Sequence, residues 1–214
     1  MKFQAAIFDM DGLLLDTERV CMRVFKQACE TLQLPFHEAV YLSIIGRNSA
    51  GIEKIFRNAY GEDYDALHAE WRVNYDAIVK HQAIPVKDGV IELLEWLKAN
   101  NIPTAVATST HKEVAEAKLR LAGLDKYFKS LTCGCEVTHG KPDPEIYLLA
   151  AKRLGIEANQ CVAFEDSNNG VRSAVSANMT TFQIPDLVEP CDEVRALGHQ
   201  IVNSLHDALT ELKK

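Results

Sequence analysis

The 214-residue sequence has no apolar stretch of membrane-spanning length, no basic run with interleaved aromatic residues, and no internal repeat or low-complexity segment. The first absence excludes a transmembrane helix, which needs about 20 apolar residues. The second, together with a formal net charge of −7, argues against a nucleic-acid-binding surface. The N-terminal apolar stretch does not suit a secretion signal, because Asp9 and Asp11 interrupt its centre and no small-residue cleavage site follows. We therefore expect a cytoplasmic protein that binds neither membranes nor nucleic acids.

The six cysteines include no C-x-x-C pair. Only Cys133 and Cys135 lie close together, as a C-x-C. Such a pair can help to hold a soft metal, but no second pair or histidine cluster accompanies it. We expect six reduced thiols. With 47% apolar and 25% charged residues, the composition is that of an ordinary globular protein with one core and an insertion, or with two modest domains.

The residues nearest the N-terminus are the most informative in the chain. Residues 5–8 are an apolar run that predicts a strand buried on both faces, and Gly12 permits the tight path of a chain that leaves a sheet. Asp9 and Asp11 stand between them, where carboxylates cost free energy unless they have a function. In open parallel sheets, ligands bind at the carboxyl ends of the strands. We therefore expect Asp9 at a ligand site.

The segment 17–83 has helical periodicity and no predicted strand. Apolar residues at i,i+4 spacing predict a helix over 17–32, with Thr17 as its cap, and residues 49–59 suit a second helix. A third helix ends near Pro85, and its apolar stripe is simplest to interpret as core packing: Leu67, Trp71, Tyr75 and Val79. The segment is thus an α-helical insertion after the first strand.

From Pro85 onward, predicted strands and helices alternate, which favours an α/β fold with a parallel, doubly wound sheet. The further strands are expected at residues 103–108, 131–134, 161–164, 181–184 and 201–202. Thr110 and Glu113 predict a capping box for one helix, and Ser204 a cap for the last. The apolar face of the first of these helices is assigned to Val114, Ala117 and Leu121.

Polar side chains stand at the carboxyl ends of three predicted strands and should face one crevice. They are Asp9 and Asp11, Thr108 and Ser109, and Glu165 and Asp166. Lys141 lies in a loop constrained by Gly140 and Pro142 and can reach the same crevice.

Clustered carboxylates in that crevice require a cation. Two unit charges 4 Å apart repel by about 4 kcal/mol at an effective dielectric constant of 20, so Lys141 alone does not balance Asp9, Asp11 and Asp166. Oxygen ligands without imidazole or thiolate favour a hard ion, and Mg²⁺ fits best. Mg²⁺ beside a lysine and a strand-end hydroxyl forms a site for a phosphoryl group. The remaining carboxylates suit nucleophilic and acid/base roles.

Together these residues resemble the four motifs of the haloacid dehalogenase superfamily. The motifs are Asp9-Met10-Asp11-Gly12, Thr108, Lys141 in Gly-Lys-Pro-Asp-Pro, and Glu165-Asp166. The resemblance covers the whole chain, because the insertion matches the position and character of the small helical cap of the β-phosphoglucomutase-like branch. It implies a Rossmann-like catalytic core of residues 1–16 and 84–214, and a mobile cap of residues 17–83 that closes over the crevice.

The resemblance also implies roles in phosphoryl transfer. Asp9 would attack phosphorus to form an aspartyl-phosphate, while Asp11 would protonate the leaving oxygen and later activate a water. Thr108 and Ser109 would bind the phosphoryl group, and Lys141 would tie it to Asp9.

The same resemblance implies a metal site and a substrate contact from the cap. Asp9, Asp166 and the main-chain carbonyl of Asp11 would hold Mg²⁺, with Glu165 bound to it directly or through water. Arg47 falls where such enzymes present substrate-binding residues, and its guanidinium suits a phosphate.

The residues narrow the reaction. Dehalogenases of this family need neither the second Asp nor Mg²⁺, and phosphonatases replace the second Asp by a small residue, so Asp11 argues against both. The related mutases carry a cap histidine and an arginine where this chain has Cys21 and Ser49. We therefore expect Mg²⁺-dependent hydrolysis of a small phosphomonoester, such as a sugar phosphate, a polyol phosphate or a nucleotide. A sugar-phosphate mutase of the β-phosphoglucomutase type is the alternative.

Two non-enzymatic alternatives remain. Receiver domains also hold an aspartyl-phosphate with clustered aspartates, a threonine and a lysine, but their phosphorylated Asp follows the third strand, whereas Asp9 follows the first. An inert binding protein on this scaffold would lack a motif, and none is missing. The expected partner is a small phosphorylated metabolite, because a closing cap excludes large polymers, and the expected assembly is a monomer or a weak homodimer.

Overall fold

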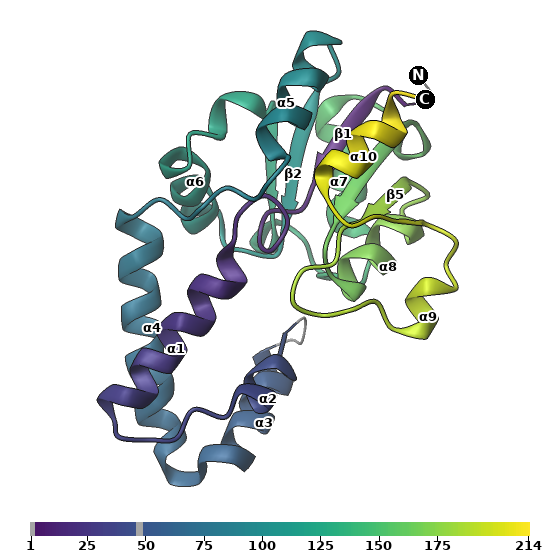
Figure 1. The fold of residues 1–214 in the computed structure, drawn as a ribbon. Helices are drawn as coiled ribbons and strands as arrows, with labels where there is room; N and C mark the ends of the chain where they lie inside the picture. The colour runs from purple at the N-terminus through teal and green to yellow at the C-terminus, as the bar shows by residue number, and fades with distance from the viewer. Residues whose placement is uncertain (1–2, 46–48) are drawn as a thin grey trace.

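The computed structural model describes residues 3–45 and 49–214 and contains a parallel sheet of six strands (Figure 1). The strands run in the order β3-β2-β1-β4-β5-β6, and every neighbouring pair is parallel. Their bounds are β1 Ala5–Phe8, β2 Thr104–Thr108, β3 Ser130–Cys133, β4 Cys161–Glu165, β5 Thr180–Gln183 and β6 Gln200–Ile201. The α/β class and all six predicted strands are confirmed to within two residues at each end.

The sheet is covered by helices on both faces, as a doubly wound fold requires. The helices are α1 Thr17–Thr31, α2 Glu38–Leu42, α3 Ser49–Tyr60, α4 Tyr64–His81, α5 Val90–Ala99, α6 Lys112–Leu121, α7 Glu145–Leu154, α8 Asn168–Ser176, α9 Asp192–Arg195 and α10 Leu205–Leu212. The short helices α2 and α9 have no counterpart in the sequence prediction.

Side chains that alternate along β1 point to the two opposite faces of the sheet, where they pack against two different layers of helices. Ala6 and Phe8 pack with residues of α5, α6 and α10, whereas Ala5 and Ile7 pack with residues of α7 and α8. All four residues are fully buried, as predicted for a strand with both faces covered. Hydrophobic burial therefore fixes β1 at the centre of the sheet.

The strand order creates a switch point at β1. The chain passes from β1 to β2 and β3 on one side, then returns to place β4 on the other side of β1. Ligand crevices of open α/β sheets lie at such a point, outside the carboxyl ends of the strands. Asp9 directly follows β1, and the carboxyl end of β4 lies beside it because Phe8 pairs with Phe164.

Helices α1 to α4 extend away from the sheet beyond this edge (Figure 1). They enclose a hydrophobic cluster of their own, in which Phe25 stacks on Phe56 with ring centroids 4.8 Å apart. The ends of α1 and α4 nearest the sheet instead join the main core through Val20 and Val79.

Among the described residues, no helix combines the length and the apolar character needed to cross a bilayer.

Two of the predicted helix caps are wrong and one is confirmed. Thr17 is the first residue of α1 and makes no capping hydrogen bond, and α6 begins after His111 without a side-chain cap. Thr110 instead uses its hydroxyl to bind Asp11, so the predicted capping box is absent. The hydroxyl of Ser204 accepts a hydrogen bond from the backbone N–H of Asp207, as a helix cap should.

Candidate active site

Asp9 and Lys141 form a buried ion pair at the carboxyl end of β1. The Lys141 ammonium donates to Asp9 Oδ1, to Glu165 Oε1 at 2.6 Å and to the Ala107 carbonyl at 3.0 Å, which satisfies its three protons. Burial raises the pKa of Asp9 to about 7, because the attraction of Lys141 does not offset burial and the repulsion from Glu165 and Asp11. The pKa of Lys141 is raised, since its two carboxylate partners outweigh its burial.

Glu165 is the fully buried anchor of Lys141. Its Oε1 also accepts from the Tyr147 hydroxyl at 2.7 Å, and its Oε2 accepts from the backbone N–H groups of Asp166 and Ser167 and from the Ser167 hydroxyl. Both oxygens are therefore occupied by protein donors. The carboxylate lies against Gly170 of α8, where an added Cβ would stand 1.9 Å from Glu165 Cδ. Only glycine fits this position.

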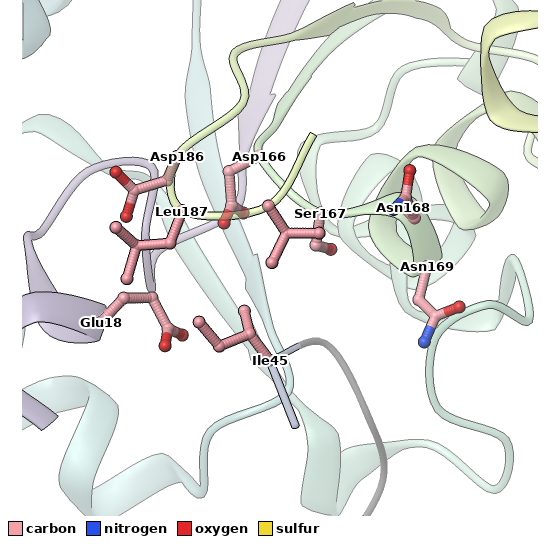
Figure 2. A pocket seen from close by; sticks show the side chains of 9 residues that line it. Glu18, Ile45, Asp166, Ser167, Asn168, Asn169, Asp186 and Leu187 are labelled. Carbon is pink, nitrogen blue, oxygen red and sulfur yellow. The ribbon is translucent and has the colours of Figure 1, made fainter. Parts of the chain in front are cut away.

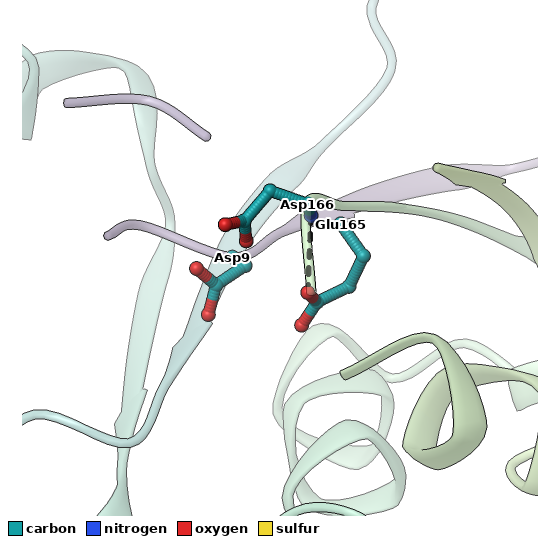
Figure 3. Close-up of side chains that lie close together, drawn as sticks. All are labelled: Asp9, Glu165 and Asp166. Carbon is teal, nitrogen blue, oxygen red and sulfur yellow. Dashed lines mark hydrogen bonds between the residues drawn. The ribbon is translucent and has the colours of Figure 1, made fainter. Parts of the chain in front are cut away.

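Asp166 completes an acidic cluster with Asp9 and Glu165, in which one carboxylate oxygen from each residue lies within 4.8 Å of the others (Figure 3). The Asp166 carboxylate accepts no hydrogen bond from the described residues. Its pKa is raised well above the usual range by burial and by the charges of Glu165 and Asp9. Gly12 has a φ of +86°, and a Cβ there would lie 2.3 Å from Asp166 Oδ2. The turn after β1 thus needs glycine for both its conformation and its closeness to Asp166.

The donor set of this cluster fits a hard cation. The cluster contains three carboxylates, and the Lys141 ammonium pairs with two of them, Asp9 and Glu165, so the group carries an excess of negative charge. No imidazole or thiolate belongs to the cluster of described residues. Because the oxygens of Glu165 are already bound, Asp9 and Asp166 are the carboxylates best able to hold an ion such as Mg²⁺ directly.

Asp11 lies beside this cluster but its carboxylate points elsewhere. Its Oδ1 accepts from the Lys118 ammonium at 2.7 Å, and its Oδ2 accepts from the hydroxyls of Thr110 at 2.6 Å and Thr108 at 3.4 Å. Burial alone would raise the pKa of Asp11, but Lys118 and the Thr110 hydrogen bond outweigh it and lower the pKa. The carboxylate of Asp11 is therefore not a member of the acidic cluster, which leaves the main-chain carbonyl as its predicted contact with a metal.

Lys118 and Thr110 are site residues that the sequence analysis missed. Lys118 is almost fully buried on α6 and lies 5.6 Å from the centre of the Tyr75 ring of α4. The buried face of α6 is Ala115, Lys118 and Leu119, not the predicted Val114, Ala117 and Leu121. The signal for Thr110 was its spacing of two from Thr108 in the same strand-end loop. Nothing in the sequence distinguishes Lys118 from a surface lysine.

Ser109 and Arg47 are the other two residues that the sequence analysis predicts to bind substrate. Ser109 is exposed and lines a cavity together with Asp11, Thr110 and Lys118. Arg47 lies outside the described residues.

A small cavity of about 80 Å³ opens beside Asp166 (Figure 2). Glu18 of α1 and Asp186, from the loop after β5, contribute their carboxylates to its wall, and Ile45 faces them from the helical segment. Burial, together with the charges of Asp11 and Asp186, raises the pKa of Glu18 to about 7. Asp186 binds both Arg19 of α1 and Lys87. The loop after β5 is thereby joined to the first helix of the insertion and to the segment that follows the insertion.

The comparisons with known proteins all indicate the same family. A family model for haloacid dehalogenase-like hydrolases matches residues 3–178. A phosphorylated carbohydrates phosphatase of Thermotoga maritima is 37% identical over 183 residues, with 82% of each chain covered. The fructose-1-phosphate phosphatase of Escherichia coli strain K12 is 29% identical, with 86% of this chain and 97% of that protein covered.

A solved structure supports the same family as the two sequence relatives. It is a crystal structure from Thermotoga maritima, provisionally described as a β-phosphoglucomutase, and it matches with a TM-score of 0.82 at 30% identity over 98% of both chains. The chain therefore belongs to the haloacid dehalogenase-like hydrolases and is an enzyme of their phosphatase branch.

Proposed function

We propose that this enzyme is a Mg²⁺-dependent phosphomonoester hydrolase that acts on a small phosphorylated metabolite through an aspartyl-phosphate at Asp9. One observation carries the proposal: the Asp9 carboxylate stands at the end of β1, held by Lys141 and grouped with Asp166. The relatives support the substrate class, since they include phosphatases of phosphorylated carbohydrates.

The proposed metal ligands are the carboxylates of Asp9 and Asp166 and the main-chain carbonyl of Asp11, with Glu165 contacting the ion through water. The Asp166 carboxylate, which accepts no hydrogen bond from residues 3–45 and 49–214, and the raised pKa values of Asp9 and Asp166 support this assignment. When bound, Mg²⁺ would offset this negative charge and that of the phosphoryl group.

In the proposed reaction, an oxygen of Asp9 attacks phosphorus and the bond from phosphorus to the leaving oxygen breaks. Asp11 acts here in its protonated form, which its lowered pKa makes a ready donor, and gives that proton to the leaving oxygen. Water then attacks the aspartyl-phosphate while Asp11 takes a proton from it, and phosphate leaves as the Asp9 carboxylate is restored. Lys118 and Thr110 hold the Asp11 carboxylate in one orientation beside the acidic cluster.

Thr108, Ser109 and Lys141 are proposed to bind the phosphoryl oxygens. Arg47 stays a prediction for substrate binding.

We also propose that residues 17–83 form a cap over a core of residues 1–16 and 84–214. The separate hydrophobic cluster of α1 to α4 supports this division. Cys21, where related mutases carry a histidine, lies in α1 and lines two cavities near the site. Burial raises the pKa of its thiol to about 12, so the neutral thiol replaces an acid/base group, which favours hydrolysis over mutase chemistry.

The proposed compartment is the cytoplasm, where reduced thiols persist. All six cysteines are free, which fits that compartment.

The test is release of phosphate from an aryl phosphate with Mg²⁺. Asp9→Asn should abolish turnover, and chelation of the metal should abolish turnover by the wild type. Asp125→Asn, at an exposed position, is the matched control and should retain activity. Intact-mass measurement after rapid quenching should find a phosphoryl adduct on the wild type and none on Asp9→Asn. Turnover by Asp9→Asn comparable to that of the control would exclude Asp9 as the nucleophile.

A further inference from the structure

A cavity of about 450 Å³ lies between helices α1, α3 and α4 of the helical insertion. This volume falls within the range of about 300–1,000 Å³ that small-molecule sites occupy. Its wall is mostly apolar and carries four rings, those of Tyr64, His68, Trp71 and Tyr75. All four belong to α4, where the spacing of three or four residues places them along one side of the helix.

The ring-lined cavity is next to the candidate active site. A second cavity, of about 400 Å³, reaches Asp11, Ser109 and Thr110. The two cavities share Cys21 of α1 and Tyr75 of α4 in their walls. A molecule that extends from Asp11 past Tyr75 therefore enters the ring-lined cavity.

The proposed chemistry decides which part of the substrate lies there. Asp11 is the residue that protonates the leaving oxygen, so the leaving group is on the side of Asp11, opposite the attack by Asp9. The cavity that borders Asp11 on this side is also lined by Cys21 and Tyr75. The ring-lined cavity is thus placed to receive the distal end of the leaving group.

The chemistry of the walls favours a flat ring as that distal end. His68 stacks on Tyr64 with centroids 5.4 Å apart and forms a T-shaped pair with Trp71, with centroids 6.3 Å apart. Ring faces and edges attract another aromatic ring through offset or edge contacts. Polyol hydroxyls would lose hydrogen bonds to water against these rings, and the buried thiol of Cys21 is a weak partner. Charged groups, Glu53, Arg72 and Asp76, lie on the same wall and can bind polar atoms at the rim of a heterocycle.

We propose that this cavity is a subsite for a planar heteroaromatic ring carried by the leaving group, so that the enzyme prefers phosphomonoesters with such a ring, as in a nucleoside 5′-monophosphate, over the corresponding sugar phosphate. This inference rests on the proposed phosphatase activity. To that activity it adds a substrate class, which the residues of α4 and α1 that line the cavity would select.

The experiment compares kcat/KM for uridine 5′-monophosphate and ribose 5-phosphate, which differ at the far end by the base alone. The wild type should favour the nucleotide by about tenfold, the size of effect expected from ring contacts with burial. His68→Leu and Tyr75→Leu should reduce the ratio toward one. Val73→Leu, at an exposed position of the same helix, should leave the ratio unchanged. The ratio cancels any general loss of catalysis, because both substrates undergo the same chemistry.

Binding gives an independent readout. The chain has two tryptophans, and Trp71 is the one in the cavity. In an Asp9→Asn and Trp96→Phe background, uridine 5′-monophosphate should quench the fluorescence of Trp71, whereas ribose 5-phosphate should not. Quenching that persists in the added presence of His68→Leu and Tyr75→Leu would contradict the assigned location.

The outcomes separate the subsite from the phosphatase activity. Equal kcat/KM for the two substrates, or hydrolysis of neither while an aryl phosphate is turned over in an Asp9-dependent manner, overturns the subsite and leaves the phosphatase proposal intact. Absence of Asp9-dependent turnover with every phosphate ester overturns the proposed function itself.

Discussion

Replacing Gly170 with alanine tests how Glu165 positions Lys141 beside Asp9. In most helices this change stabilises by up to about 1 kcal/mol, because alanine is the better helix former. At Gly170 the new Cβ would stand 1.9 Å from Glu165 Cδ and must retreat to at least 3.0 Å. Glu165 is fully buried between Tyr147 and Lys141, so it has no free space on the other side.

The magnitude follows from the contacts that movement would break. Glu165 accepts hydrogen bonds at 2.6 Å from the charged Lys141 and at 2.7 Å from Tyr147, and a shift of an ångström removes both. Hydrogen bonds to charged groups contribute roughly 1.5–3 kcal/mol each. After the helical gain, Gly170→Ala should lower the free energy of unfolding by about 2–5 kcal/mol. Misplacement of Lys141 relative to Asp9 should reduce kcat/KM by about 100-fold.

The assay is urea denaturation followed by circular dichroism, combined with turnover of an aryl phosphate in Mg²⁺. Ser176→Ala, at an exposed position of the same helix, is the control and should change neither quantity. In a Glu165→Ala background the clash is absent, so adding Gly170→Ala should then be neutral or stabilising. If Gly170→Ala alone is as stable as the wild type, the steric argument is wrong.

Two further predictions concern charge. Lys118→Met should lower kcat about tenfold without weakening Mg²⁺ affinity, because Asp11 loses the ammonium that orients it, and Lys118→Arg should restore part of the rate. Steady-state kinetics with Mg²⁺ titrations measure both effects, and an unchanged kcat would remove Lys118 from the site. The second prediction follows from the pKa of Asp9, which burial raises to about 7 from 3.8. Between these pH values the folded, metal-free protein holds a proton that the unfolded chain has lost, so its stability falls as the pH rises through this window. Thermal unfolding in chelator at pH 5 and pH 7.5 should show that loss in the wild type and a smaller one in Asp9→Asn, whereas equal losses would contradict it.

The six strands were predictable because most of them are short apolar runs. A strand that helices cover on both faces needs apolar side chains at successive positions, and this pattern is visible in the sequence. The helices α1, α3 and α4 were predictable for a similar reason, since their apolar stripes repeat at helical spacing. Helices α2 and α9 were missed because their five and four residues are too few to show a period. The parallel, doubly wound sheet followed from the alternation of strands and helices, whereas the order of the strands was not predicted and comes from the structure.

Within the site, residue type and position at strand ends were enough to bring together Asp9, Thr108, Lys141, Glu165 and Asp166. The carboxyl ends of parallel strands meet at one edge, so side chains that follow different strands become neighbours. By contrast, the partners of each group depended on packing. Thr110 resembled a helix cap in the sequence, yet its hydroxyl binds Asp11 because the loop after β2 passes beside the loop after β1.

The sequence by itself determined the sheet, the helical insertion and the identity of the acidic residues, because these depend on local periodicity and on the ends of strands. Only the tertiary structure decided that Lys118 holds Asp11, that Glu165 is fully engaged with protein donors and that Gly170 leaves room for it. It also decided that four rings of α4 border a cavity next to the site. These features depend on the distances between side chains that are far apart in the sequence, and close packing of distant elements sets those distances.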